Sequence, residues 1–139
     1  MPRRTFVDSL FVIALVNRRD QYHRQASTLA ASLRGEPLLT TDAVLLEIGN
    51  GLARSYKKEA VAILEELRTA DELKIVPLTP DLFERAFHLY KTRQDKEWGL
   101  VDCVSFVVMK DEGVQSALTF DRHFRQAGFE ALMQEIEPT

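Results

Sequence analysis

Short apolar runs alternate with longer segments of helical pattern along nearly the whole chain, and this alternation most strongly limits the fold. The runs at 5–7, 37–40, 73–78 and 116–120 have the length and composition of buried strands. A repeated order of strand, helix and strand favours a parallel sheet with helices on both faces. We therefore expect an α/β protein with a central parallel sheet of four or five short strands.

Residues typical of helix ends stand between these runs. Ser9 and either Thr41 or Asp42 occupy positions where N-caps are expected. Thr79 is followed by a proline, which is a good helix start, and Gly35 is a natural C-terminal stop. The expected helices cover 9–17, a part of 18–35, 41–56, 57–70, 79–93, 100–113 and a short segment after residue 121, with a final strand or turn in 130–136.

The size and composition fit one ordinary globular domain. The chain has 139 residues, 45% of them hydrophobic and 28% charged, so a core can form without a metal or disulfide staple. Its formal net charge of −3 argues against avid, non-specific nucleic-acid binding through a basic surface. The one cysteine, Cys103, permits no intrachain disulfide, and no apolar stretch approaches the length of a membrane span. We expect a single domain over 1–139, located in the cytoplasm.

Two aspartates fall at the ends of predicted strands. Asp8 follows the strand at 5–7, and Asp121 follows the strand at 116–120. Taken alone, each is an ordinary helix N-cap. Parallel sheets, however, bind ligands beyond the carboxyl ends of their strands, so side chains that follow two strands there can converge.

Two further acids lie in predicted helices. Asp102 opens a helix that is apolar on nearly every side, so we expect a buried carboxylate that needs a partner. Glu47 shares its helical face with polar residues, and a solvent-exposed stripe explains that face without any chemistry. Gly49 and Gly51 each cost a helix about 1 kcal/mol relative to Ala, which indicates that another element packs closely there.

A group of four carboxylates favours a divalent cation. Clustered carboxylates repel one another and raise one another's pKa values. Mg²⁺ and Mn²⁺ prefer oxygen ligands and remove that cost. Such a cation polarises a phosphoryl oxygen and supplies hydroxide near neutral pH, which favours hydrolysis of a phosphodiester. The sequence therefore predicts a catalytic, metal-binding group of Asp8, Glu47, Asp102 and Asp121.

The chain resembles the PIN-domain ribonucleases, in particular the VapC-like toxins of type II toxin–antitoxin pairs. The resemblance runs along almost the whole chain, and the acids follow the order and spacing of the family. The stretches that carry it are "FVDSLFVIALVNRRDQYHRQA", "LLTTDAVLLEIGNGLA", "EWGLVDCVSFVVMKDEG" and "ALTFDRHFRQAGF", of which the last two are the most specific.

This resemblance implies a three-layer α/β/α sandwich, Mg²⁺- or Mn²⁺-dependent endonuclease activity on RNA, a homodimer and a cognate antitoxin. It implies products with 5′-phosphate and 3′-hydroxyl ends. It also assigns all four acids as metal ligands or catalytic groups and makes Ser9 and Thr119 supporting hydroxyls. Two positions depart from the family pattern: Gly99 stands where a Ser or Thr cap is common, and Asp42 stands where Asn is common. Neither departure removes a ligand.

Several basic residues are open to two interpretations. Arg54 and Lys57 follow the helical glutamate along the chain. They form either a solvated face, which is the default, or contacts to RNA phosphates. Weaker candidates for the same RNA contacts are Arg18, Arg19, Arg93 and Lys96.

Two hypotheses compete with the nuclease. A receiver-like phosphoacceptor domain also has acids at strand ends, but it requires adjacent acids after its first strand, where this chain has Asp8 and Ser9. A PIN-fold module that binds RNA or protein without turnover is the other hypothesis, and the presence of all four acids argues against it. His123 lies close to the fourth acid in sequence, and we expect it to have a structural role.

Overall fold

The computed structural model describes residues 3–137, in which strands and helices alternate as the sequence predicts. The strands are β1 (Thr5–Val7), β2 (Leu38–Thr41), β3 (Leu73–Val76), β4 (Ser116–Leu118) and β5 (Glu130–Ala131). The helices are α1 (Ser9–Val16), α2 (His23–Ser32), α3 (Asp42–Leu52), α4 (Lys57–Thr69), α5 (Pro80–Thr92), α6 (Leu100–Asp111) and α7 (Arg122–Gln126).

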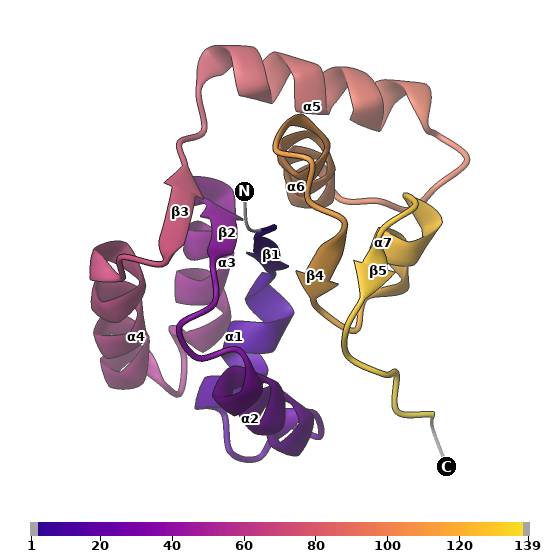
Figure 1. The fold of residues 1–139 in the computed structure, drawn as a ribbon. Helices are drawn as coiled ribbons and strands as arrows, with labels where there is room; N and C mark the ends of the chain where they lie inside the picture. Colours follow the sequence, from indigo (N-terminus) through magenta and orange to yellow (C-terminus); the bar gives the residue numbers. More distant parts are fainter. Residues whose placement is uncertain (1–2, 138–139) are drawn as a thin grey trace.

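The five strands form one fully parallel sheet in the order β3-β2-β1-β4-β5 (Figure 1). The first strand therefore lies in the centre, between a strand from the first third of the chain and one from the last. Because the strands are parallel, the residues that follow β1 and β4 emerge at the same edge of the sheet. This edge holds the residues after Val7 and after Leu118.

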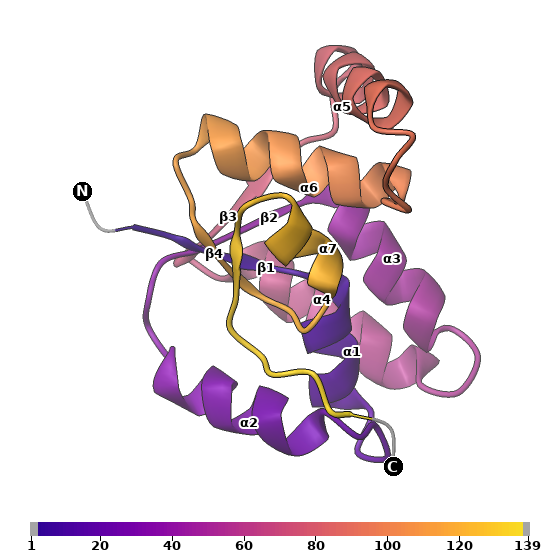
Figure 2. The ribbon, with the colours of Figure 1, turned by 90° about the vertical axis from the view of Figure 1, so that its right-hand side faces the viewer.

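Helices cover both faces of the sheet, which confirms the three-layer α/β/α architecture (Figure 2). Val7 and Leu118 face a hollow between α1, α2 and α4. On the opposite face Phe6 packs against Phe124 of α7, which packs edge-on against Phe106 of α6 at a centroid distance of 5.0 Å. The alternation of strand side chains between faces thus places an apolar core on each side.

Several of the expected element ends are shifted. The second helix ends at Ser32 rather than at Gly35, which adopts a φ of +82° in the turn that follows. The third helix ends at Leu52 instead of residue 56. Strand β3 stops at Val76, because Pro77 has no N–H with which to continue the ladder.

The caps are as predicted at two of the three proposed positions. The hydroxyls of Thr41 and Thr79 accept hydrogen bonds from the backbone N–H groups three residues later, at 3.2 and 3.1 Å. The prediction of Ser9 as a cap was wrong. Asp8 occupies the N-cap position of α1, and Ser9 is the first helical residue. The Ser9 hydroxyl is therefore free to bond elsewhere.

One of the two glycines of α3 marks a close approach. A Cβ atom on Gly51 would lie 2.6 Å from Cδ1 of Ile13, in helix α1. A Cβ on Gly49 would meet Leu64 at 3.8 Å, which is ordinary contact. The predicted close packing is thus found at Gly51 and brings α1 against α3, the two helices that follow β1 and β2.

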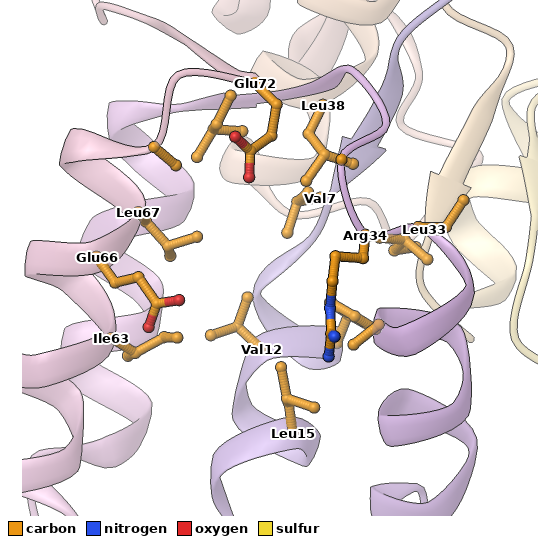
Figure 3. Close-up of a pocket in the computed structure, with 16 residues that line it drawn as sticks. Val7, Val12, Leu15, Leu33, Arg34, Leu38, Ile63, Glu66, Leu67 and Glu72 are labelled. Atoms are coloured by element: carbon orange, nitrogen blue, oxygen red, sulfur yellow. The ribbon is translucent and has the colours of Figure 1, made fainter.

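An apolar cavity of about 210 Å³ lies between α1, α2 and α4 (Figure 3). Val12 and Leu67 point into it from facing helices, and Arg34 reaches in from the end of α2. None of the four predicted acids lines this cavity. The candidate chemistry therefore lies elsewhere, at the carboxyl edge of the sheet.

No helix within residues 3–137 has both the length and the apolar character needed to cross a bilayer.

Candidate active site

Asp8 is the most deeply buried of the predicted acids. Its side chain follows β1, is 5% exposed and makes no capping hydrogen bond to α1. Instead its Oδ2 accepts a hydrogen bond of 2.8 Å from the hydroxyl of Thr119. The interpretation of Asp8 as a simple helix cap was therefore wrong.

Burial gives this carboxyl an unusual affinity for protons. Desolvation raises the pKa of Asp8 from its ordinary value of 3.8 to about 7, against the lowering effect of the Thr119 hydrogen bond. The negative charges of Glu47 and Asp102 raise that pKa further. These two acids, 39 and 94 residues away in sequence, therefore act on Asp8 from close by in space.

Glu47 reaches the same edge from α3. Its side chain is half-buried, and its Oε1 accepts a hydrogen bond of 2.9 Å from the hydroxyl of Ser9. Burial raises the pKa of Glu47, the Ser9 hydrogen bond lowers it, and the charges of Asp102 and Asp121 raise it. The solvated-stripe interpretation of this glutamate thus fails, because the side chain turns toward the other acids.

Asp102 lies in the first turn of α6, and its Oδ2 accepts two hydrogen bonds. The backbone N–H of Gly99 donates at 3.0 Å, and Nδ1 of His123 lies at 2.9 Å. The first bond closes the start of α6 even though Gly99 has no side chain with which to cap it. Asp102 is less buried than the sequence predicts: its side chain is 21% exposed, since the first turn of α6 emerges from the core.

Asp121 caps α7 and contributes to the acidic group at the same time. Its Oδ1 accepts a hydrogen bond from the backbone N–H of His123 at 2.9 Å. Its own N–H donates to the Thr119 hydroxyl at 3.0 Å, and that hydroxyl donates in turn to Asp8. Thr119 therefore ties the segment after β4 to the acid after β1.

His123 lies in this site, although the sequence analysis expected only a structural role for it. Its Nδ1 lies 2.9 Å from Oδ2 of Asp102 and 3.5 Å from Oδ1 of Asp121. The ligand atoms of these three residues lie within 4.8 Å of one another. The only signal in the sequence was its position two residues after Asp121. A residue two positions after an N-cap can lie close to the capping side chain.

The donor set fits a hard divalent cation. Within residues 3–137, no Lys or Arg forms an ion pair with any of the four acids, and His123 is their one potentially cationic contact. The closest group contains Asp102, Asp121 and His123, with Asp8 and Glu47 beside it. A cation that keeps several waters can bridge such a spread of carboxylates.

Arg54 and Lys57 lie apart from this group. Both are exposed, Arg54 just beyond the end of α3 and Lys57 at the start of α4. Among the described residues, neither forms an ion pair with an acid of the site. Cys103, next to Asp102 in sequence, is fully buried, and burial raises the pKa of its thiol to about 11. Its thiol is therefore a packing group.

Comparison with known sequences reveals a consistent family. The model of the PIN domain matches residues 5–130. The chain is 34% identical over 124 residues to the 23S rRNA-specific endonuclease VapC20 of Mycobacterium tuberculosis, covering 89% of this chain and 94% of that protein. It is also 34% identical over 103 residues to the VapC ribonuclease of Aquifex aeolicus, covering 73% of each.

Solved structures show the same fold. The crystal structure of M. tuberculosis VapC20, described as a Sarcin-Ricin loop cleaving toxin, superposes with a TM-score of 0.82 and covers 90% of this chain and 95% of that one. FitAcB from Neisseria gonorrhoeae superposes with a TM-score of 0.63 at 17% identity, covering 93% of this chain and 96% of that one. The second similarity concerns the fold alone.

Proposed function

The chain belongs to the PIN-domain family, and we propose that it is a metal-dependent endoribonuclease that acts as the toxin of a type II toxin–antitoxin pair. The observation that carries this proposal is the convergence of Asp8, Glu47, Asp102 and Asp121 at one edge of the sheet, without a Lys or Arg partner among residues 3–137. Family membership also argues against the receiver-like hypothesis.

We assign separate roles to the four acids. Asp8, Asp102 and Asp121 would hold Mg²⁺ or Mn²⁺, and Glu47 would bind the ion or orient water. When bound, the cation would neutralise charge on the phosphate and make hydroxide available near neutral pH. Ser9 fixes one oxygen of Glu47, and Thr119 fixes one oxygen of Asp8. These two hydroxyls hold the carboxylates before substrate arrives.

His123 supports this assignment as a positioning residue. Both hydrogen bonds that Asp102 accepts from residues 3–137 go to Oδ2, one from His123 and one from Gly99. The other oxygen, Oδ1, is thus left for a ligand. With the rotation of its carboxylate fixed, Asp102 needs little reorganisation on binding a cation.

The biological setting is proposed from the relatives. M. tuberculosis VapC20 is named for cleavage of 23S rRNA, and the A. aeolicus relative is named a ribonuclease. We propose RNA as the substrate class of this chain, an antitoxin protein as its regulator, a homodimer as its assembly and the cytoplasm as its location. A non-catalytic PIN-fold module is the outcome that the following experiment would favour if no turnover occurs.

The test is RNA cleavage with purified protein under control of metal. We expect fragments with 5′-phosphate ends in Mg²⁺ or Mn²⁺, loss of cleavage when a chelator is added, and recovery when the cation is returned in excess. Product ends are read by their susceptibility to a phosphatase. Cleavage that continues in chelator, or cation binding without any cleavage, would contradict the proposal.

Replacing Arg54 and Lys57 together by Gln is expected to weaken RNA affinity and to reduce its dependence on salt. Removing one cation that neutralises a phosphate of single-stranded RNA lowers the slope of log affinity against log salt by about 0.7. Anisotropy titrations of labelled RNA at several salt concentrations measure both quantities. An unchanged affinity and slope would show that these residues form only a solvated face.

A further inference from the structure

The last two turns of α5 carry exposed aromatic side chains on one face. Phe87 and Tyr90 are 37% and 45% exposed, and their ring centroids are 6.4 Å apart. The helix packs on α6 through the adjoining face, where Leu82 and Ala86 are buried. The ammonium of Lys91 lies over the Phe87 ring, while Tyr90 keeps 45% of its surface exposed and available to a ligand.

These rings border a shallow cavity with a cationic rim. The cavity has a volume of about 370 Å³, within the roughly 300–1,000 Å³ range of small-molecule sites. Lys91, Arg93 and Lys96 line it together with a single carboxylate, that of Glu97. Neither lysine forms an ion pair within the described part of the chain.

Trp98 lines the cavity, and its ring is held in place by its neighbours. Trp98 is 6% exposed, packs edge-on against Phe106 and donates its indole N–H to Gln126 at 2.9 Å. The guanidinium of Arg93 lies 5.0 Å from the centre of the Trp98 ring and also pairs with Asp95. Arg93 is thus already engaged, and the ammonium of Lys91 lies over the Phe87 ring, 5.1 Å from its centroid. Both lysines remain without a carboxylate partner among the described residues.

Consecutive residues of the chain connect this cavity to the acidic site. Trp98 directly precedes Gly99, whose N–H binds the carboxylate of Asp102. Figures 1 and 2 show the segment that leaves α5 returning directly to the first turn of α6. The lining of the cavity and the hydrogen-bond partner of Asp102 are thus consecutive residues of the chain.

Resting on the proposed nuclease function, we propose that this cavity binds an unpaired nucleotide of the RNA substrate beside the scissile bond. The base stacks on Tyr90, and the flanking phosphates contact Lys91 and Lys96. Single-stranded RNA is commonly held in this way, by aromatic rings under the bases and cations along the backbone. The site thus selects RNA that is unpaired next to the cleavage position.

The charge of the cavity favours RNA over a second copy of the chain. An aromatic helix face alone also fits a protein contact. Here, however, three cations and one carboxylate line the cavity, and only one of the cations, Arg93, forms an ion pair within the described residues. The acidic residues of α5, Asp81 and Glu84, lie in its first two turns, outside that lining. A polyanion complements this rim.

The test is binding of a short, labelled, single-stranded RNA to the full chain in chelator, read by anisotropy, with the RNA checked for integrity on a gel. We expect Tyr90→Ala to weaken binding roughly five- to a hundredfold, the range for loss of one stacked base. Tyr90→Phe keeps the ring and should retain affinity. The double variant Lys91→Gln/Lys96→Gln should lower the salt slope by about 1.4.

The matched control is Lys110→Gln, an exposed lysine in the last turn of α6, at the opposite end of that helix from Asp102. It should bind RNA like the wild type.

The proposal is overturned if Tyr90→Ala and the double lysine variant both bind like this control, or if the wild type binds no RNA. It is equally overturned if Tyr90→Ala dissociates a dimer in sedimentation while RNA affinity stays unchanged. Cleavage is not read, so failure of the nuclease proposal leaves this result interpretable.

Discussion

Replacing Asp8 by Asn is expected to reduce RNA cleavage by about a thousandfold or more while the protein remains folded. Asn has the shape of Asp and keeps an oxygen that accepts the Thr119 hydrogen bond, but it removes the charge that would hold the cation. A bound metal contributes several kcal/mol of transition-state stabilisation, and about 4 kcal/mol corresponds to a thousandfold in rate. Initial rates on a labelled RNA measure the effect.

Asp71→Asn is the matched control for this experiment. Asp71 is an exposed carboxylate between α4 and β3, outside the acidic group, so its loss should leave cleavage at the level of the wild type. Circular dichroism and thermal unfolding establish that both variants are folded. An Asp8→Asn protein that cleaves RNA as fast as the Asp71→Asn protein would remove Asp8 from the mechanism.

Without metal, the free energy of unfolding is expected to fall as the pH rises from about 4 to about 7. Asp8 has a folded-state pKa of about 7 against an ordinary value of 3.8, so the folded state holds its proton more tightly than the unfolded state. Its contribution to stability is fully present below pH 4 and is lost as the pH passes 7. A shift of this size corresponds to at most roughly 4 kcal/mol. Glu47 acts in the same direction.

Denaturant titrations across this pH range measure the effect, and Asp8→Asn is the comparison. The variant lacks the titrating group, so its stability should decline less than that of the wild type between pH 4 and 8. At pH 8, Mn²⁺ should restore wild-type stability by about 2.7 kcal/mol at a hundred times its dissociation constant, and should do so little for the variant. Equal pH profiles for the two proteins would show that the pKa of Asp8 is not raised in the folded state.

The architecture was predictable from local patterns, whereas the strand order was not. Runs such as those at 5–7 and 116–120 indicate strands through their composition, and Thr41 and Thr79 indicate helix starts through the hydrogen bonds that a hydroxyl can make. The central place of β1, between β2 and β4, depends on pairings between residues far apart in sequence. No local pattern encodes those pairings.

The residue types of the candidate site were predictable, but their relative burial was not. Helical periodicity placed Asp102 among apolar neighbours, yet it does not show where a helix emerges from the core, and Asp102 is 21% exposed. Asp8 has the sequence position of an ordinary cap and instead has the more deeply buried carboxylate, because β4 brings the Thr119 hydroxyl to it. His123 joins the site through the first turn of α7, a contact that only the folded chain creates.

The cavity beside α5 shows the same limit. The sequence indicated Arg93 and Lys96 as weak candidates for RNA contacts, because isolated cations are normally solvated. The fold places them around Trp98 and the exposed rings of α5. This grouping of cations and aromatic rings is the basis for the proposed nucleotide-binding cavity. Arg54 and Lys57, which ranked above them as candidates although a solvated face was the default interpretation, are not among the residues that line the cavity.

The most direct test of the account is an anomalous difference map from crystals of the wild-type protein grown with Mn²⁺. We predict a peak at the carboxyl edge of the sheet, coordinated by oxygens of Asp8, Asp102 or Asp121, and no such peak in crystals of the Asp8→Asn variant. A protein that cleaves RNA in Mn²⁺ while its crystals show no manganese among these side chains would contradict the account.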